Sequence, residues 1–98
     1  MYANVIDSYR YVVAICDKEL IGKRFEQGKF QLDIKENFYK GEKKTSEQVR
    51  VIIESMKAED ATFNITGKKA VETAIEMGLI NSNNVKTIAN IPYALVLL

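Results

Sequence analysis

The pattern of apolar and polar positions along the chain predicts five strands. Residues 5–6 and 11–16 are rich in β-branched and aromatic side chains, and the second run is apolar on both faces, as in a central strand. Residues 30–35 alternate strictly, which is typical of a strand with one buried face. Residues 61–65 and 93–98 complete the set. The side chains expected to point inward from residues 30–35 are Phe30, Leu32 and Ile34.

Two amphipathic helices are predicted between these strands. Thr45 and Gln48 have the spacing of a capping box at the start of the first helix, and Thr66 is expected to cap the second. Gly78 followed by an apolar residue predicts a helix end at which the glycine adopts a positive φ. On the first helix we expect an ion pair between Arg50 and Glu54. The apolar stripes are Val49, Ile52, Ile53 and Met56 on the first helix, and Ala70, Val71, Ala74 and Ile75 on the second.

The element order β-β-β-α-β-α-β predicts an α+β fold. We expect a two-layer sandwich, with two helices packed on one face of a mostly antiparallel sheet that includes Leu32 and Ile34. Residues 85–89 are expected to form a helical turn before Pro92. A chain of 98 residues is enough for one core, so residues 1–98 are expected to form a single domain.

Composition removes several classes of function. The chain has 14 basic and 13 acidic residues and a formal net charge of +1, so no strong field attracts nucleic acid or membrane. It contains no histidine, which excludes Ser-His-Asp and Cys-His catalysis. Its one cysteine excludes an internal disulfide and multi-cysteine zinc sites. We therefore expect no cofactor and no metal site.

The beginning of the sequence and its apolar runs predict a cytoplasmic location. No basic segment followed by an apolar run opens the sequence, so no signal peptide is expected. The longest apolar runs are much shorter than the ~20 residues that a membrane-spanning helix needs. A lone thiol fits the same compartment.

Basic residues next to aromatic residues suggest one binding surface. Lysines interleaved with exposed rings bind RNA by phosphate contact and base stacking, and the segment Phe38–Lys44 joins both kinds of residue. The start of the second helix adds free amides and two lysines that suit a phosphate. The alternative is that the two rings belong to the core and the lysines only keep the surface soluble. The candidate RNA-binding residues are Tyr39, Lys40, Lys43, Lys44, Lys68 and Lys69.

Cys16 and Asp17 are the candidates for a reactive site. A thiol at a strand end, with Lys18 nearby, has the setting of a thiolate of low pKa. Because no histidine is present to act as a base, we expect instead a buried and inert thiol followed by a charged turn. The acidic residues of the chain follow no metal-loop spacing.

The C-terminal run Tyr93–Leu98 contains no charged residue. As an interior strand it is simply core, whereas as an edge strand it favours pairing with another chain. The sequence therefore also allows a homodimer or a protein–protein interaction module that uses this strand.

Several segments resemble a small archaeal family known as domain of unknown function 424. They are Val12–Lys23, Phe38–Gly41, Asn64–Val71, Gly78–Ile80 and Asn84-Val85. The family usually ends in Val-Pro-His, where this chain has Ile91-Pro92-Tyr93, so no role of that histidine is carried over. The resemblance implies an archaeal cytosolic protein with a compact α/β fold and no established activity. It also favours a role in translation or RNA metabolism.

These observations leave three functions open. The first is a non-enzymatic binding protein associated with RNA or the translation apparatus. The second is the protein–protein module or homodimer formed through the C-terminal strand. The third is a small enzyme that uses Cys16 and nearby acids.

Overall fold

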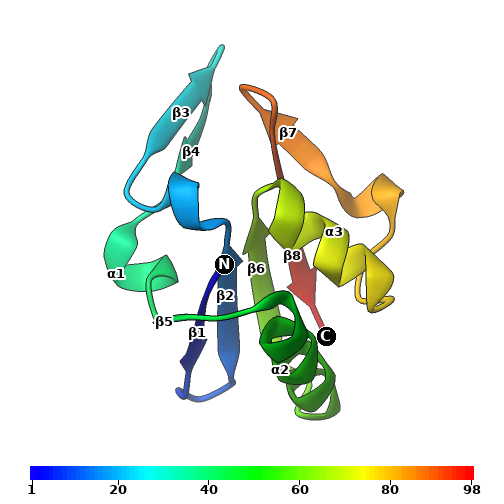
Figure 1. The fold of residues 1–98 in the computed structure, drawn as a ribbon. Coiled ribbons are helices and arrows are strands. Elements are labelled where there is room, and N and C mark those ends of the chain that lie inside the picture. The colour runs from blue at the N-terminus through cyan, green and yellow to red at the C-terminus, as the bar shows by residue number, and fades with distance from the viewer.

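A six-stranded sheet organises the molecule (Figure 1). The computed structural model describes residues 1–98. The strand order is β5-β1-β2-β6-β8-β7, and a separate two-stranded hairpin is formed by β3 and β4. The strands are β1 (Tyr2–Ile6), β2 (Val12–Cys16), β3 (Arg24–Gln27), β4 (Phe30–Asp33), β5 (Glu42–Lys43), β6 (Thr62–Thr66), β7 (Lys86–Ile88) and β8 (Ile91–Leu97). The helices are α1 (Glu36–Tyr39), α2 (Ser46–Ala58) and α3 (Lys68–Glu76), with single 3-10 turns η1 (Lys18–Leu20) and η2 (Ser82–Asn84).

The pairing of the strands confirms the predicted α+β sandwich. All neighbours in the main sheet run antiparallel except β2 and β6, which are parallel, with Val13 opposite Phe63 and Cys16 opposite Thr66. Parallel neighbours need a long crossover connection, and the segment that contains α2 provides it. The carboxyl ends of β2 and β6 therefore meet at the same end of the sheet.

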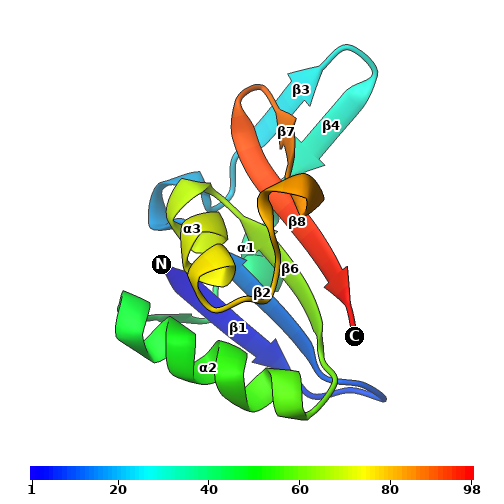
Figure 2. The ribbon, with the colours of Figure 1, turned by 90° about the vertical axis from the view of Figure 1, so that its right-hand side faces the viewer.

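Helices α2 and α3 cover one face of the sheet (Figure 2). The predicted capping box at Thr45 and Gln48 is present, with both reciprocal hydrogen bonds made. The stripes of both helices pack on the core, although Ile75 at its border is 38% exposed. The buried residues of this cluster are Ala3, Val13, Ile15, Val49, Ile53, Ala61, Phe63, Ile65, Ala70, Val71, Ala74, Ile80 and Ala94.

The expectation that Leu32 and Ile34 lie under the two helices is wrong. Both belong to a second, smaller cluster that includes Ala14 and Cys16 of β2, which point away from Val13 and Ile15. Successive side chains of a strand point to opposite faces, so this cluster lies on the other face of the sheet. Its remaining buried members are Leu20 and Tyr39, which come from η1 and α1.

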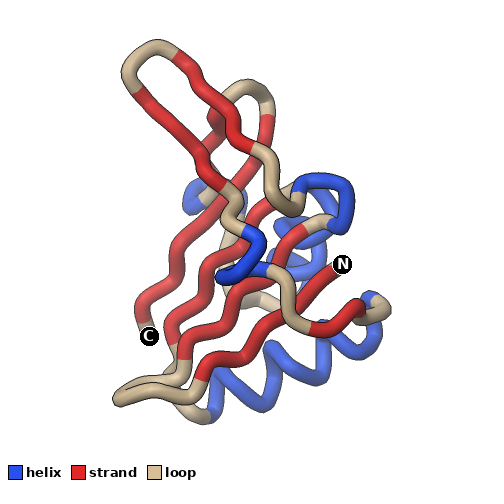
Figure 3. The backbone as a smooth tube through the Cα atoms, turned by 90° about the vertical axis from the view of Figure 1, so that its left-hand side faces the viewer, coloured by secondary structure: helices blue, strands red, loops and turns tan.

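Two hairpins project together from one end of the molecule (Figure 3). Residues 30–35 were predicted as a strand of the main sheet, but β4 pairs only with β3. Residues 85–89 were predicted as a helical turn, but Lys86–Ile88 form β7, which pairs with β8. The tips are joined because the backbone N–H of Ala89 donates a hydrogen bond of 2.7 Å to the side-chain oxygen of Gln27.

The helix ends differ in how well they were predicted. Gly78 has φ +70°, and the N–H of Leu79 donates to the carbonyl oxygen of Ala74, which confirms the predicted helix end. Arg50 pairs with Glu76 of α3 at 2.6 Å rather than with Glu54, so this ion pair joins two helices. No helix is long and apolar enough to cross a membrane.

Candidate functional site

Asp17, the residue that follows β2, caps the N-terminus of α3. Its two carboxylate oxygens accept hydrogen bonds from the backbone N–H groups of Lys69 (3.0 Å) and Ala70 (2.8 Å). The predicted cap, Thr66, is instead the last residue of β6, and Gly67 occupies the N-cap position with no side-chain bond of its own. A carboxylate at a helix N-terminus satisfies free amides and complements the helix dipole. Two of the amides that were expected to hold a phosphate therefore already have an anionic partner, which overturns that part of the prediction.

Gly67 is the residue that allows this cap. Its φ of +109° lies in the region that side chains rarely adopt. A Cβ built at this position would overlap with Cγ of Asp17. The sequence motif Thr66-Gly67-Lys68-Lys69 is thus explained by the geometry of a helix start, and Lys68 and Lys69 remain exposed on its outer surface.

Cys16 lies fully buried beside this cap. Its thiol donates a 3.2 Å hydrogen bond to the carbonyl oxygen of Asp17. Burial, reinforced by the negative charges of Asp17 and Glu19, raises the pKa of the thiol to about 12. Because the thiolate is the nucleophilic form of cysteine, this setting contradicts Cys16 as a reactive residue. The predicted burial is confirmed, and Asp17 is a helix cap rather than a catalytic acid.

Tyr39 is a core residue, so its predicted role as an exposed stacking ring is wrong. The side chain is 8% exposed. Its hydroxyl oxygen accepts a 3.0 Å hydrogen bond from the hydroxyl of Thr66, and the ring packs edge-on against Phe38. Burial raises the pKa of the Tyr39 hydroxyl, while the bond to Thr66 acts in the opposite direction.

The three lysines after Tyr39 are not equivalent. Lys40 pairs with Glu36 at 3.2 Å, and Lys44 pairs with Glu42 at 2.9 Å. Each pair shows in the pKa values: the bond to Glu36 raises the pKa of Lys40, and the bond to Lys44 lowers the pKa of Glu42. Lys43 is exposed and has no ion pair. Two of the three positive charges of the segment Phe38–Lys44 are therefore paired with the acidic residues Glu36 and Glu42.

The contacts around Tyr39 join separate parts of the sequence. The bond from Thr66 to Tyr39 brings α1 to the start of α3, and the side chain of Asn4 donates to the carbonyl oxygen of Phe38 at 2.8 Å. The N–H of Gly67 also donates to the carbonyl oxygen of Pro92 at 2.8 Å. The segments that carry the family resemblance around Cys16, Tyr39 and Gly67 therefore meet in one buried structural cluster.

The structure forms a groove that the sequence did not predict. We call it the hairpin groove, because it lies between the β3–β4 and β7–β8 hairpins and has a volume of about 290 Å³. Phe30 was expected to point into the core, yet its side chain is 62% exposed at this groove. The residues lining it are Gln27, Phe30, Lys86, Thr87, Ile88 and Tyr93.

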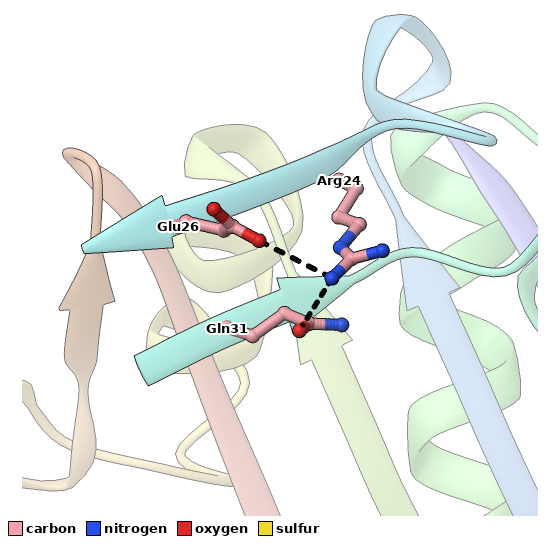
Figure 4. A network of polar contacts seen from close by, with 3 residues as sticks. All are labelled: Arg24, Glu26 and Gln31. Atoms are coloured by element: carbon pink, nitrogen blue, oxygen red, sulfur yellow. Dashed lines mark hydrogen bonds and ion pairs between the residues drawn. The ribbon is translucent and has the colours of Figure 1, made fainter. Parts of the chain in front are cut away.

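The β3–β4 hairpin has one polar and one apolar face. On the polar face, the guanidinium of Arg24 contacts Glu26 at 3.2 Å and Gln31 at 2.8 Å (Figure 4). Phe25 and Leu32 are paired on the opposite face and pack against the second core cluster. Phe30 lies two residues before Leu32 and so continues this apolar face beyond the part that the core covers.

A turn signal was available for this hairpin. Gln27 and Phe30 are paired partners, so the loop between them consists of only Gly28 and Lys29. A two-residue loop with glycine at its first position is typical of a β-hairpin, and Gly28 has φ +59°. The alternation of apolar and polar residues predicted which side chains share a face. It did not predict that Phe30, at the end of this face, lies beyond the core and is exposed.

The sequence profile of a family described as "Protein of unknown function (DUF424)" matches residues 6–98. The chain belongs to this family. A crystal structure of an uncharacterized conserved protein from Methanopyrus kandleri has the same fold, with a TM-score of 0.85 and 21% sequence identity. The match covers 97% of this chain and 88% of that chain. The comparison with curated proteins finds no match.

Proposed function

We propose that this member of the family is a binding protein that contacts single-stranded RNA through the hairpin groove. The observation that carries the proposal is Phe30, a large ring that is 62% exposed in a groove it shares with Tyr93 and Lys86. The apolar face of an exposed ring is in contact with water, and a nucleic acid base can stack on that face and remove it from water.

The surroundings of Phe30 suit the rest of a nucleotide. Lys86 lines the groove, and Lys29 lies in the turn next to Phe30. Lysine side chains attract phosphates without regard to base sequence, whereas a ring gains stacking energy with every base. The residues Gln27 and Thr87 add polar side chains to the same wall. This combination favours a groove that binds single strands with modest sequence preference.

The hairpin groove is a better candidate than the segment Phe38–Lys44. Tyr39 is buried there, and Lys40 and Lys44 are engaged by Glu36 and Glu42. Nucleophilic chemistry at Cys16 is disfavoured by a thiol pKa of about 12. A binding function therefore fits the exposed residues of the structure better than a catalytic function does. We include in this proposal that the RNA bound by the groove belongs to the translation apparatus.

The test is fluorescence anisotropy with a labelled oligouridine of about ten nucleotides, which is within the usual site size of such grooves. The parent protein should bind at low salt. Phe30→Ala should weaken binding about 5- to 150-fold, because stacking is worth roughly 1–3 kcal/mol per base. Lys86→Ala should reduce the slope of log affinity against log salt by about 0.7, the value for one phosphate contact on a single strand.

Tyr9→Ala and Lys43→Ala are the matched controls. Tyr9 is a fully exposed ring in the β1–β2 loop, at the end of the molecule opposite the hairpins (Figure 1). Lys43 is an exposed lysine outside the groove. Neither change should alter affinity if binding is at the groove. Absence of binding by the parent at low salt, or equal losses in Tyr9→Ala and Phe30→Ala, would overturn the proposal.

A further inference from the structure

The outer edge of β8 is only partly covered. On its inner side β6 pairs with β8 from Tyr93 to Leu97. On its outer side β7 pairs with Ile91, Pro92 and Tyr93 and then ends. From Ala94 onward, the outer edge of β8 therefore has no neighbouring strand.

The open edge presents the backbone groups of two leucines. The N–H of Gly67, which continues β6, donates to the carbonyl oxygen of Pro92, so the backbone of Pro92 faces the β6 side. In an antiparallel ladder, residues along a strand turn alternately toward one neighbour and then the other. Ala94 and Val96 therefore face β6, whereas the N–H and C=O groups of Leu95 and Leu97 face outward.

The side chains at this edge are apolar and exposed. Leu95 is 59% exposed and Leu97 is 72% exposed, both on the sheet face opposite α2 and α3. No charged residue lies between Ile91 and Leu98. Exposed edges are usually protected by a charged side chain, a proline or a bulge, and residues 94–98 contain no charged side chain and no proline.

We propose that this edge pairs with a second copy of the chain, antiparallel, so that Leu95 of each copy lies opposite Leu97 of the other. The outward-facing residues are placed symmetrically about Val96, so the edge is complementary to itself under a two-fold rotation. Each Leu95–Leu97 pair then exchanges two hydrogen bonds, and the four leucines form one apolar cluster on the same face.

Other registers fit less well. A shift by one residue places Leu95 and Leu97 opposite residues of the other copy whose N–H and C=O groups already bond to β6, so the two edges could not exchange ladder hydrogen bonds. A shift that places Leu95 opposite Leu95 retains a single hydrogen-bonded pair, because Lys86 already occupies the position beside Tyr93. The interface is short compared with stable dimers, which bury about 1,600 Å², so the dimer should form at high protein concentration.

Cysteine cross-linking tests the register. Val96 would face its own copy in a non-hydrogen-bonded pair, where Cα atoms are about 4.5 Å apart, within disulfide range. Leu95 would lie diagonal to its own copy at about 7–8 Å, which is too far. Under mild oxidation Val96→Cys should form a covalent dimer and Leu95→Cys should not. The parent protein is the control for Cys16, which is fully buried.

Sedimentation over a range of protein concentrations gives a second measurement. The parent should show a reversible monomer–dimer equilibrium. Leu97→Lys should raise the dissociation constant of the dimer at least tenfold. A melting curve identifies any variant that fails to fold. A parent that stays monomeric at every concentration, or a disulfide in Leu95→Cys without one in Val96→Cys, would overturn the proposal.

Discussion

Asp17 and Gly67 fit together at the end of the parallel strands: the carboxylate of Asp17 occupies the space that a Cβ on Gly67 would take. From that position, Asp17 bonds the amides of Lys69 and Ala70 at the start of α3. β2 thereby fixes the first turn of a helix that begins about fifty residues later, through a buried carboxylate that is 3% exposed.

Gly67→Ala should therefore destabilise the protein by at least about 2 kcal/mol, because it combines a strained φ with overpacking against Asp17. Gly78→Ala is the matched control: its φ is +70° but no atom lies within 4 Å of the added Cβ. That change should cost about 1 kcal/mol. Urea unfolding of both variants measures the difference, and equal losses would mean that the approach of Asp17 is not limiting.

Asp17→Ala should cost about 2–4 kcal/mol, since two hydrogen bonds to a buried carboxylate are lost and the amides of α3 are left without a partner. Asp17→Asn keeps one acceptor oxygen, so it should lower the free energy of unfolding by less than Asp17→Ala does. Amide hydrogen exchange at Lys69 and Ala70 provides a local readout, because both should exchange faster in Asp17→Ala. Unchanged protection at these two amides would contradict the capping role.

Local patterns predicted most of the fold but little of the candidate site. The capping box at Thr45 and the helix end at Gly78 were predictable because each depends on residues within one turn. The cap of α3 was not, since Asp17 is 53 residues from Ala70 and no spacing rule links them. The prediction that Phe30 points into the core was wrong for a related reason. Alternation determines which side chains lie on the same face of a strand, whereas the burial of each one depends on how far the hairpin extends beyond the core.

Cys16 should make stability depend on alkaline pH. Its pKa is raised from 9.0 to about 12 in the folded protein, so folding favours the protonated thiol. This contribution is fully present below about pH 9 and is lost as the pH rises toward about 12. Between about pH 8 and about pH 11, the free energy of unfolding measured in urea should decrease less for Cys16→Ala than for the parent. A thiol reagent at neutral pH should also react slowly with the native protein and quickly after unfolding, whereas rapid native labelling would contradict the buried state.

Tyr39→Phe separates structure from binding. The change removes the hydroxyl that accepts the hydrogen bond from Thr66, leaving a buried Thr66 hydroxyl without a partner, and should cost about 1–2 kcal/mol. RNA affinity per folded molecule should be unchanged, because Tyr39 is 8% exposed. Phe30→Ala should give the opposite result, with weaker binding and a melting temperature close to that of the parent, since its ring is 62% exposed. If Tyr39→Phe weakens binding while Phe30→Ala does not, the RNA contact lies near α1 and not in the hairpin groove.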